Sequence, residues 1–208
     1  MQKLKRLMIG LAVAAVTLAI GIGVASWFKQ RSRANRCAQA SYFPNGILRQ
    51  DRRAEWRTRY YAAMLEQPFT CYEEDAEVYR LLYLPSFEHP TSIRIWRNGN
   101  QYQMTVKQLS AELATEGRPE HLVLNATRSL TVEEWNKFQE LLNKSNFSSM
   151  KSIDVREPGL DGVSFLLEGK RDGKYHVVDR WVPEDESFLD LCGYMVELTN
   201  LTWNYQRR

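Results

Sequence analysis

Hydrophobic and polar positions follow three different patterns along this chain. Residues 7–28 form an apolar run without a charged side chain, whereas later segments alternate every second residue or repeat every three to four. As a helix, the apolar run measures roughly 33 Å, enough to cross a hydrocarbon core of about 30 Å. The pattern predicts a transmembrane helix over 7–28 that contacts membrane lipid.

The residues around this run indicate how it is used. A secretory signal cleaved after Ala25 is one interpretation, because Gly23, Val24 and Ala25 include small residues. Against cleavage, the run exceeds the usual signal length, and a stop-transfer-like flank follows it, made of Lys29, Arg31, Arg33 and Arg36. We expect an uncleaved signal anchor with a short cytoplasmic tail (1–6) and an exported remainder in a single-pass membrane protein. The basic residues balance across the run, so the orientation follows from the order of tail and apolar segment.

Residues 29–67 are predicted as a basic juxtamembrane linker and helix. Asp51 to Leu65 has helical spacing, with an apolar stripe of Trp56, Tyr60, Ala63 and Met64. Four arginines near that stripe are candidates for contact with anionic headgroups, namely Arg49, Arg52, Arg53 and Arg57. The alternative is an ordinary packing helix whose arginines are solvated or pair with acidic groups of the domain that follows.

Two hairpins are predicted in the remaining residues, 68–208. After a strand at Glu77 to Leu84, an Asn98-Gly99 turn joins strands at Thr91 to Trp96 and Gln101 to Lys107. This turn would pair Ile93 with Met104 and leave the opposite face, with Arg94 and Trp96, in water. The second hairpin joins Val163 to Gly169 with Lys174 to Trp181, through a loop of two or four residues.

Helix signals complete the predicted domain, and His121 to Thr127 adds a further short strand. Thr131 and Glu134 form a capping box, and the last helix starts near Asp185 or Ser187 and ends at Leu198. Short hairpin links between these elements predict an α+β domain over 68–208, with an antiparallel sheet and two or three helices packed on one face.

A group of motifs in the second hairpin resembles a known family. It consists of Glu168-Gly169, the pattern Gly-x-Tyr-His-x-Val from Gly173, Arg180-Trp181 and a cysteine, Cys192, in the following helix. This stretch resembles bacterial envelope proteins of unassigned function, over roughly the last 130 residues. The resemblance implies an envelope location and no particular activity.

The same hairpin holds the candidate catalytic residues. His176 and Arg180 lie on one face of the predicted strands, whereas Glu168, Tyr175 and Asp179 lie on the other. An enzyme would use His176 as general acid or base and Arg180 to hold an anion, with Glu168 as the third group. The pleat separates His176 from the carboxylates, which favours a structural role and a cross-strand pair between Glu168 and Tyr175.

Metal and cofactor chemistry have little support. His89, His121 and His176 are scattered, and Asp161 lies in a glycine-flanked turn without calcium-loop spacing, so we expect no metal and no cofactor. For an exported domain, Cys37 and Cys71 are the disulfide candidate, with Cys192 as a buried thiol. Three reduced thiols, or a Cys71–Cys192 bond, remain open alternatives.

Charge distribution limits the function classes. The net charge of +3 combines a basic region before residue 60 with an acidic remainder, which argues against nucleic acid as a partner. The leading hypothesis is an exported binding or interaction module with an envelope protein as partner. Its candidate binding residues are Arg94, Trp96, Asp161 and Trp181. The alternative is a membrane-tethered hydrolase-like or transferase-like enzyme that uses His176, Glu168 and Arg180.

Overall fold

The computed structural model describes residues 24, 31, 37, 40–44, 46–48, 52–72, 75–110, 121–153 and 162–201, apart from the side chains of 52 and 53. The chain divides into residues 1–41 and a compact unit, 42–208, to which the following description refers. Among the described residues, no helix has both the length and the apolar character needed to cross a membrane. The predicted span over 7–28 lies outside them except for Val24, as do Arg49 and Asp161.

In the described part of the compact unit, six strands form one antiparallel sheet in the order β4-β3-β2-β1-β5-β6. Their bounds are β1 (Glu77–Pro85), β2 (Thr91–Asn98), β3 (Gln101–Leu109), β4 (Leu122–Leu130), β5 (Val163–Arg171) and β6 (Lys174–Trp181). The predicted α+β class and antiparallel sheet are therefore confirmed.

The register of the first hairpin differs from the prediction. Asn98 pairs with Gln101, so the two turn residues are Gly99 and Asn100, and Ile93 faces Val106 rather than Met104. Gly99 has a φ of +59° at the first turn position, where a II′-type turn places glycine. A shift by two residues keeps each side chain on its predicted face, because side chains alternate with a period of two.

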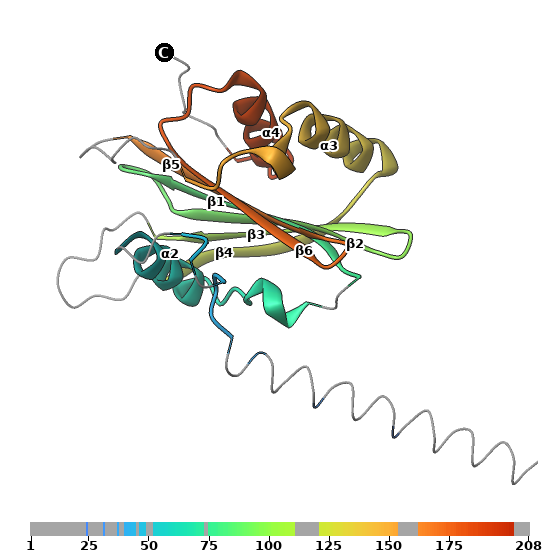
Figure 1. Cartoon of the computed structure of the whole chain (residues 1–208), viewed down its shortest axis with the longest axis horizontal. Helices are drawn as coiled ribbons and strands as arrows, with labels where there is room; N and C mark the ends of the chain where they lie inside the picture. Colours follow the sequence, from blue (N-terminus) through green and yellow to red (C-terminus); the bar gives the residue numbers. More distant parts are fainter. Residues whose placement is uncertain are drawn as a thin grey trace, which may run out of the picture. The chain divides into compact units, whose positions relative to one another are not determined.

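Helices cover both faces of the sheet. Figure 1 shows α3 (Val132–Lys144) and α4 (Glu186–Glu197) on one face and α2 (Arg52–Ala63) on the other. The prediction that the helices pack on one face was wrong, because α2 belongs to the compact unit and has its own hydrophobic cluster, which includes Tyr61, Met64, Leu82 and Leu166. The face of the first hairpin that was expected to meet water is accordingly covered in part: Ser92 and Thr105 on it are buried.

Local sequence signals explain where α3 and α4 begin. Thr131 Oγ1 accepts a hydrogen bond from Glu134 N, and a Glu134 carboxylate oxygen accepts one from Thr131 N, which completes the predicted capping box. Asp185 caps α4 by accepting from Phe188 N. Both helices place apolar residues such as Phe138 and Phe188 against the sheet, in the larger of the two hydrophobic clusters.

The end of α2 is formed by a residue in an unfavourable conformation. Glu66 N donates to Tyr61 O and Leu65 N donates to Ala62 O, the bond pattern of a Schellman motif. The motif needs a residue in the left-handed conformation. Here Leu65 adopts that conformation, with a φ of +53°, and it is 74% exposed. In this way the chain reverses sharply and brings Glu66 next to Tyr61, with a short turn η1 (Phe69–Cys71) following.

Candidate functional site

Arg80, at the centre of β1, is a fully buried charged residue of the sheet. Its side chain is fully buried beneath α2. In the sheet register, Arg80 lies opposite Glu168 of β5 on one side and Arg94 of β2 on the other. An acid beside it is favourable, but two arginines directly opposite each other repel, so the β1–β2 side needs a further negative charge.

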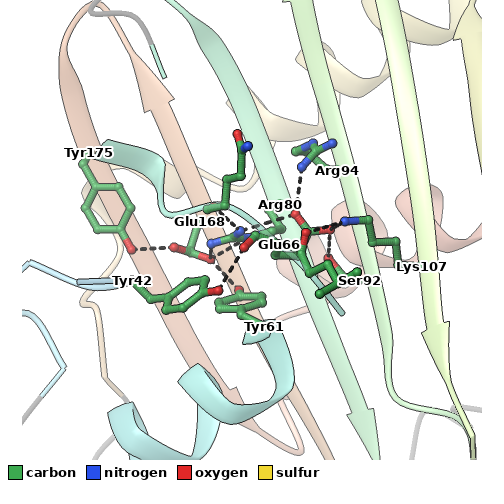
Figure 2. Close-up of polar contacts among 11 residues, drawn as sticks. Tyr42, Tyr61, Glu66, Arg80, Ser92, Arg94, Lys107, Glu168 and Tyr175 are labelled. Carbon is green, nitrogen blue, oxygen red and sulfur yellow. Dashed lines mark hydrogen bonds and ion pairs between the residues drawn. The ribbon is translucent and has the colours of Figure 1, made fainter. Parts of the chain in front are cut away.

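Glu66 supplies that charge from the turn that follows α2. Its Oε2 lies 2.8 Å from Arg94 Nη1 and 3.5 Å from Arg80 Nη1, and its Oε1 accepts from Ser92 Oγ at 3.3 Å. Lys107 Nζ adds a third cation 3.4 Å from Oε1. Figure 2 shows these side chains converging between α2 and the sheet. The Schellman turn at Leu65 is what delivers Glu66 to this position.

On the β5 side, Glu168 is surrounded by hydrogen-bond donors. Its Oε2 accepts from Arg80 Nε at 3.0 Å, from Arg80 Nη2 at 2.8 Å and from the Tyr61 hydroxyl. Its Oε1 accepts from the Tyr175 hydroxyl at 2.8 Å, which confirms the predicted cross-strand pair. Together with Glu66, Arg94 and Lys107, these residues form what we call the buried ionic cluster.

Two aromatic rings and a backbone carbonyl complete the surroundings of Arg80. The guanidinium carbon lies 3.8 Å from the Tyr61 ring centroid and 4.7 Å from that of Phe69, and Nη1 donates to Gln67 O at 2.8 Å. Burial by itself would lower the pKa of Arg80, but Glu168, Tyr61, Glu66 and Tyr72 together outweigh it and the net pKa is raised. Arg80 is therefore held as a cation.

The tyrosines of the cluster are held neutral. Burial, and then the negative charge of Glu168, raises the pKa of Tyr61 and of Tyr175 well above the ordinary value. Neutral phenols donate to Glu168 and cannot serve as phenolate bases. With its donors and acceptors matched, the cluster fixes α2 to the sheet and has no exposed group with which to begin a reaction.

The candidate catalytic residues are not brought together. Glu168 lies in the buried ionic cluster on the α2 face, whereas His176 packs on the other face, with its ring 4.9 Å from the Phe147 ring. Arg180 shares the face of His176, but its Nη2 donates to Lys151 O at 2.6 Å at the sheet margin. In the described residues no three metal-ligating side chains come together, and both His89 and His121 are exposed.

The four arginines predicted to contact a membrane surface differ in what the structure describes of them. Arg49 lies outside the described residues, and the side chains of Arg52 and Arg53 do too, although both belong to α2. Arg57 is only 3% exposed, so it does not reach a membrane surface; its Nη2 donates to Asp179 Oδ1 at 2.9 Å and to Ser164. This agrees with the alternative in which an arginine of the helix pairs with the acidic domain.

The candidate binding residues are scattered. Arg94 is largely buried, donates to Glu66 and lies over the Trp96 ring at 5.0 Å from its centroid. Trp181 is half-buried and packs closely over Gly162, and Asp161 lies outside the described residues. Cys37 and Cys71 are both disulfide-bonded, and Cys192 is a free, buried thiol.

Sequence reasoning missed Arg80, Glu66 and Tyr61. A signal for Arg80 was present, since a charged residue inside the apolar strand from Val78 to Leu84 requires a buried partner. Glu168 interrupts β5 in the same way. For Glu66 no comparable signal exists, because its position depends on a left-handed turn at a leucine.

The β4 edge is the other notable feature. In the described part of the chain, β4 pairs with β3 alone, and five of its nine residues are exposed. The opposite edge, β6, is paired at one residue: Asp179 N donates to Ser152 O at 2.8 Å, and Ile153 forms a parallel bridge to Asp179.

No protein-family model, curated protein sequence or solved structure matches this chain. The resemblance to bacterial envelope proteins therefore stays an expectation drawn from the motifs of the second hairpin, and the function is argued from geometry.

Proposed function

We propose that the chain is a membrane-anchored, exported binding module that adds an extended segment of a partner protein to the β4 edge of its sheet. The observation that carries the proposal is the outer side of β4, which pairs with no other strand in the described residues. An edge strand presents unpaired backbone N–H and C=O groups, and the natural complement of such a row is another extended backbone.

The composition of β4 supports this use. Sheet edges are commonly protected by lysine, proline or short length, but β4 has nine residues without either residue type. The charged side chain of β4, Arg128, is engaged by other groups: its Nη2 donates to Glu134 Oε1 at 2.8 Å and to Leu198 O at 2.9 Å. Val123, Asn125, Ala126, Thr127 and Ser129 remain exposed along the strand. An incoming strand would meet small or apolar side chains and no opposing charge.

The alternative enzyme needs His176, Glu168 and Arg180 to act on one substrate. Glu168 is fully buried and accepts hydrogen bonds from three residues, Arg80, Tyr61 and Tyr175, on the face opposite His176. This separation weighs against a shared reaction and in favour of binding. The expected anchor over 7–28, and the disulfide-bonded state of Cys37 and Cys71, support an exported location and so a partner in the envelope.

Photocrosslinking tests the proposal in cells. A photoreactive amino acid is placed at Val123 on β4, or at Val132 on α3 as the control, since the two side chains are similarly exposed at 48% and 53%. We expect adducts with a partner protein from position 123 alone, and we expect a peptide from the crosslinked partner segment to bind the purified full chain. Identical adducts from both positions would refute strand addition, and adducts between copies of this chain alone would refute a different protein as partner.

Proline substitution then tests the backbone pairing itself. Consecutive residues of an antiparallel strand direct their N–H groups to opposite sides, so one of Asn125→Pro and Ala126→Pro removes a bond to β3 and the other an outward N–H. We expect the outward variant to keep its stability and lose the partner peptide. If that variant binds as tightly as the original chain, the peptide does not pair with β4.

A further inference from the structure

A cavity of about 270 Å³ lies on the sheet face opposite the buried ionic cluster. It is partly open and is lined by the end of α3, the short turn η2 (Phe147–Ser149) and the end of the β5–β6 hairpin. Aromatic rings of Tyr79 and Phe147 line it together with His176, while Arg171 and Lys174 come from the hairpin end. Its size is close to the lower limit of typical small-ligand sites.

Gly169 determines how close these rings approach the sheet. A Cβ at this position would lie 2.8 Å from Phe147 and 2.9 Å from Tyr79. Glycine therefore lets both rings pack directly on β5, with His176 as the register partner of Gly169 on β6. The wall of the cavity depends on this missing side chain.

His176 carries an unused acceptor beside the cavity. Its Nε2 is buried and has no hydrogen-bond partner, although the residue lines the cavity. Burial lowers its pKa, against the opposing effect of hydrogen bonds to the backbone at Met150 and Phe147, so the ring is neutral near pH 7. Because those bonds leave Nε2 unused, Nδ1 carries the proton and Nε2 offers a lone pair. A buried acceptor without a donor is costly, and a ligand donor would relieve that cost.

Positive charge lies at the hairpin end of the same cavity. Lys174 is exposed. Arg171 is about half exposed and interacts with the Tyr79 side chain, and its ion-pair distances are long, 3.8 Å to Glu77 and 3.6 Å to Asp172. Glu77 also lies 3.1 Å from Arg97. A ligand acid could therefore be held by Lys174 and Arg171 without breaking a close ion pair.

We propose that this cavity binds a small organic anion that also carries a hydroxyl or amino donor. The donor bonds His176 Nε2, the acidic group is held by Lys174 and Arg171, and the aliphatic part lies against Phe147 and Tyr79. A small side-chain adjustment, of the kind common in binding sites, brings the ligand donor to the shielded Nε2 atom. This site lies apart from strand addition at β4, and neither proposal depends on the other.

Three probe molecules separate the required groups. Lactate has both the carboxylate and the hydroxyl, propanoate lacks the hydroxyl, and 1,2-propanediol lacks the charge. Binding to the full chain is measured by ligand-observed NMR titration at millimolar concentrations. We expect lactate to bind about fivefold tighter than propanoate, the usual effect of one added hydrogen bond, and propanediol to bind weakest. Equal binding of lactate and propanoate, or no binding of either, overturns the proposal.

Variants assign the contacts. His176→Phe keeps an aromatic ring against Phe147 and should abolish the preference for lactate over propanoate. Lys174→Gln should weaken both acids, whereas Lys144→Gln, an exposed lysine of α3 that pairs with Asp190 outside the cavity, should change neither. The probe comparison on the unmodified chain stands by itself if His176→Phe fails to fold. If Lys144→Gln and Lys174→Gln weaken the acids equally, attraction is non-specific and the site assignment is wrong.

Discussion

At the scale of single residues, Arg80 and Glu168 form a buried ion pair within the sheet that Tyr61 of α2 contacts. Both side chains are fully buried, and Arg80 Nη2 lies 2.8 Å from Glu168 Oε2. A buried ion pair adds little over a well-packed apolar pair, because removing two charges from water is costly. Breaking one member is different, since the remaining charge is left in an apolar environment.

We therefore expect Glu168→Gln to lower the free energy of unfolding by about 3–5 kcal/mol, the usual cost of an orphaned buried charge. Urea denaturation measures it. The control is Glu140→Gln, whose ion pair with Lys137 is exposed and should contribute less than about 1 kcal/mol. The double variant Arg80→Met with Glu168→Leu should be less destabilised than Glu168→Gln. A cost of Glu168→Gln no larger than that of the control would contradict the role of the cluster.

At Leu65, a substitution is expected to raise the free energy of unfolding rather than to lower it. A leucine in the left-handed region costs roughly 1–2 kcal/mol relative to a conformation that glycine adopts freely, and its exposed side chain returns little. Leu65→Gly should therefore raise the free energy of unfolding by about 1 kcal/mol, measured by urea denaturation. Leu65→Ala, which keeps a Cβ, should not. Destabilisation by Leu65→Gly would mean that the side chain makes a contact of its own.

At the scale of elements, the sequence predicted which strands and helices exist, and which face each side chain of a strand lies on, better than it predicted the register between strands. Face alternation placed His176 and Glu168 on opposite sides correctly, because that period survives a shift of register. The exact turn at Gly99 could not be predicted, since Asn98-Gly99 and Gly99-Asn100 both satisfy two-residue turn chemistry. The buried side of α2 was rotated by one residue, because Arg57 faces Asp179 while Trp56 is 40% exposed. A prediction based only on the spacing of apolar residues places arginine on the exposed side of a helix, so it could not find the buried position of Arg57.

The start of α4 predicts a pH dependence. Hydrogen bonds from Ser187 and from Phe188 N lower the pKa of Asp185 below its ordinary value of 3.8. A lowered folded-state pKa means that the carboxylate stabilises the fold above the unfolded pKa and that this contribution is lost as the pH falls through the folded value. Asp185→Asn should thus be less stable than the unmodified chain at pH 7, with the difference narrowing below about pH 4. Urea midpoints across this range measure it, and a constant difference would exclude the charged cap.

At the scale of the whole molecule, charge divides the chain into a basic N-terminal region and an acidic remainder. Residues 29–59 have nine basic side chains against Asp51 and Glu55, whereas residues from 60 onward have more acidic than basic side chains. Arg57 shows that part of this basic region serves the domain itself, through Asp179.

The predicted topology is tested by fusing alkaline phosphatase after Arg208 of the full chain. This reporter is active only where its disulfides form, outside the cytoplasm, so an exported domain gives activity in the membrane fraction. A fluorescent reporter that folds only in the cytoplasm, fused at the same position, should be dark. Cytoplasmic activity of the fluorescent fusion would overturn the exported assignment. The size of the membrane-bound chain separates the two N-terminal alternatives, because cleavage after Ala25 shortens a chain of 24.3 kDa and releases it from the membrane.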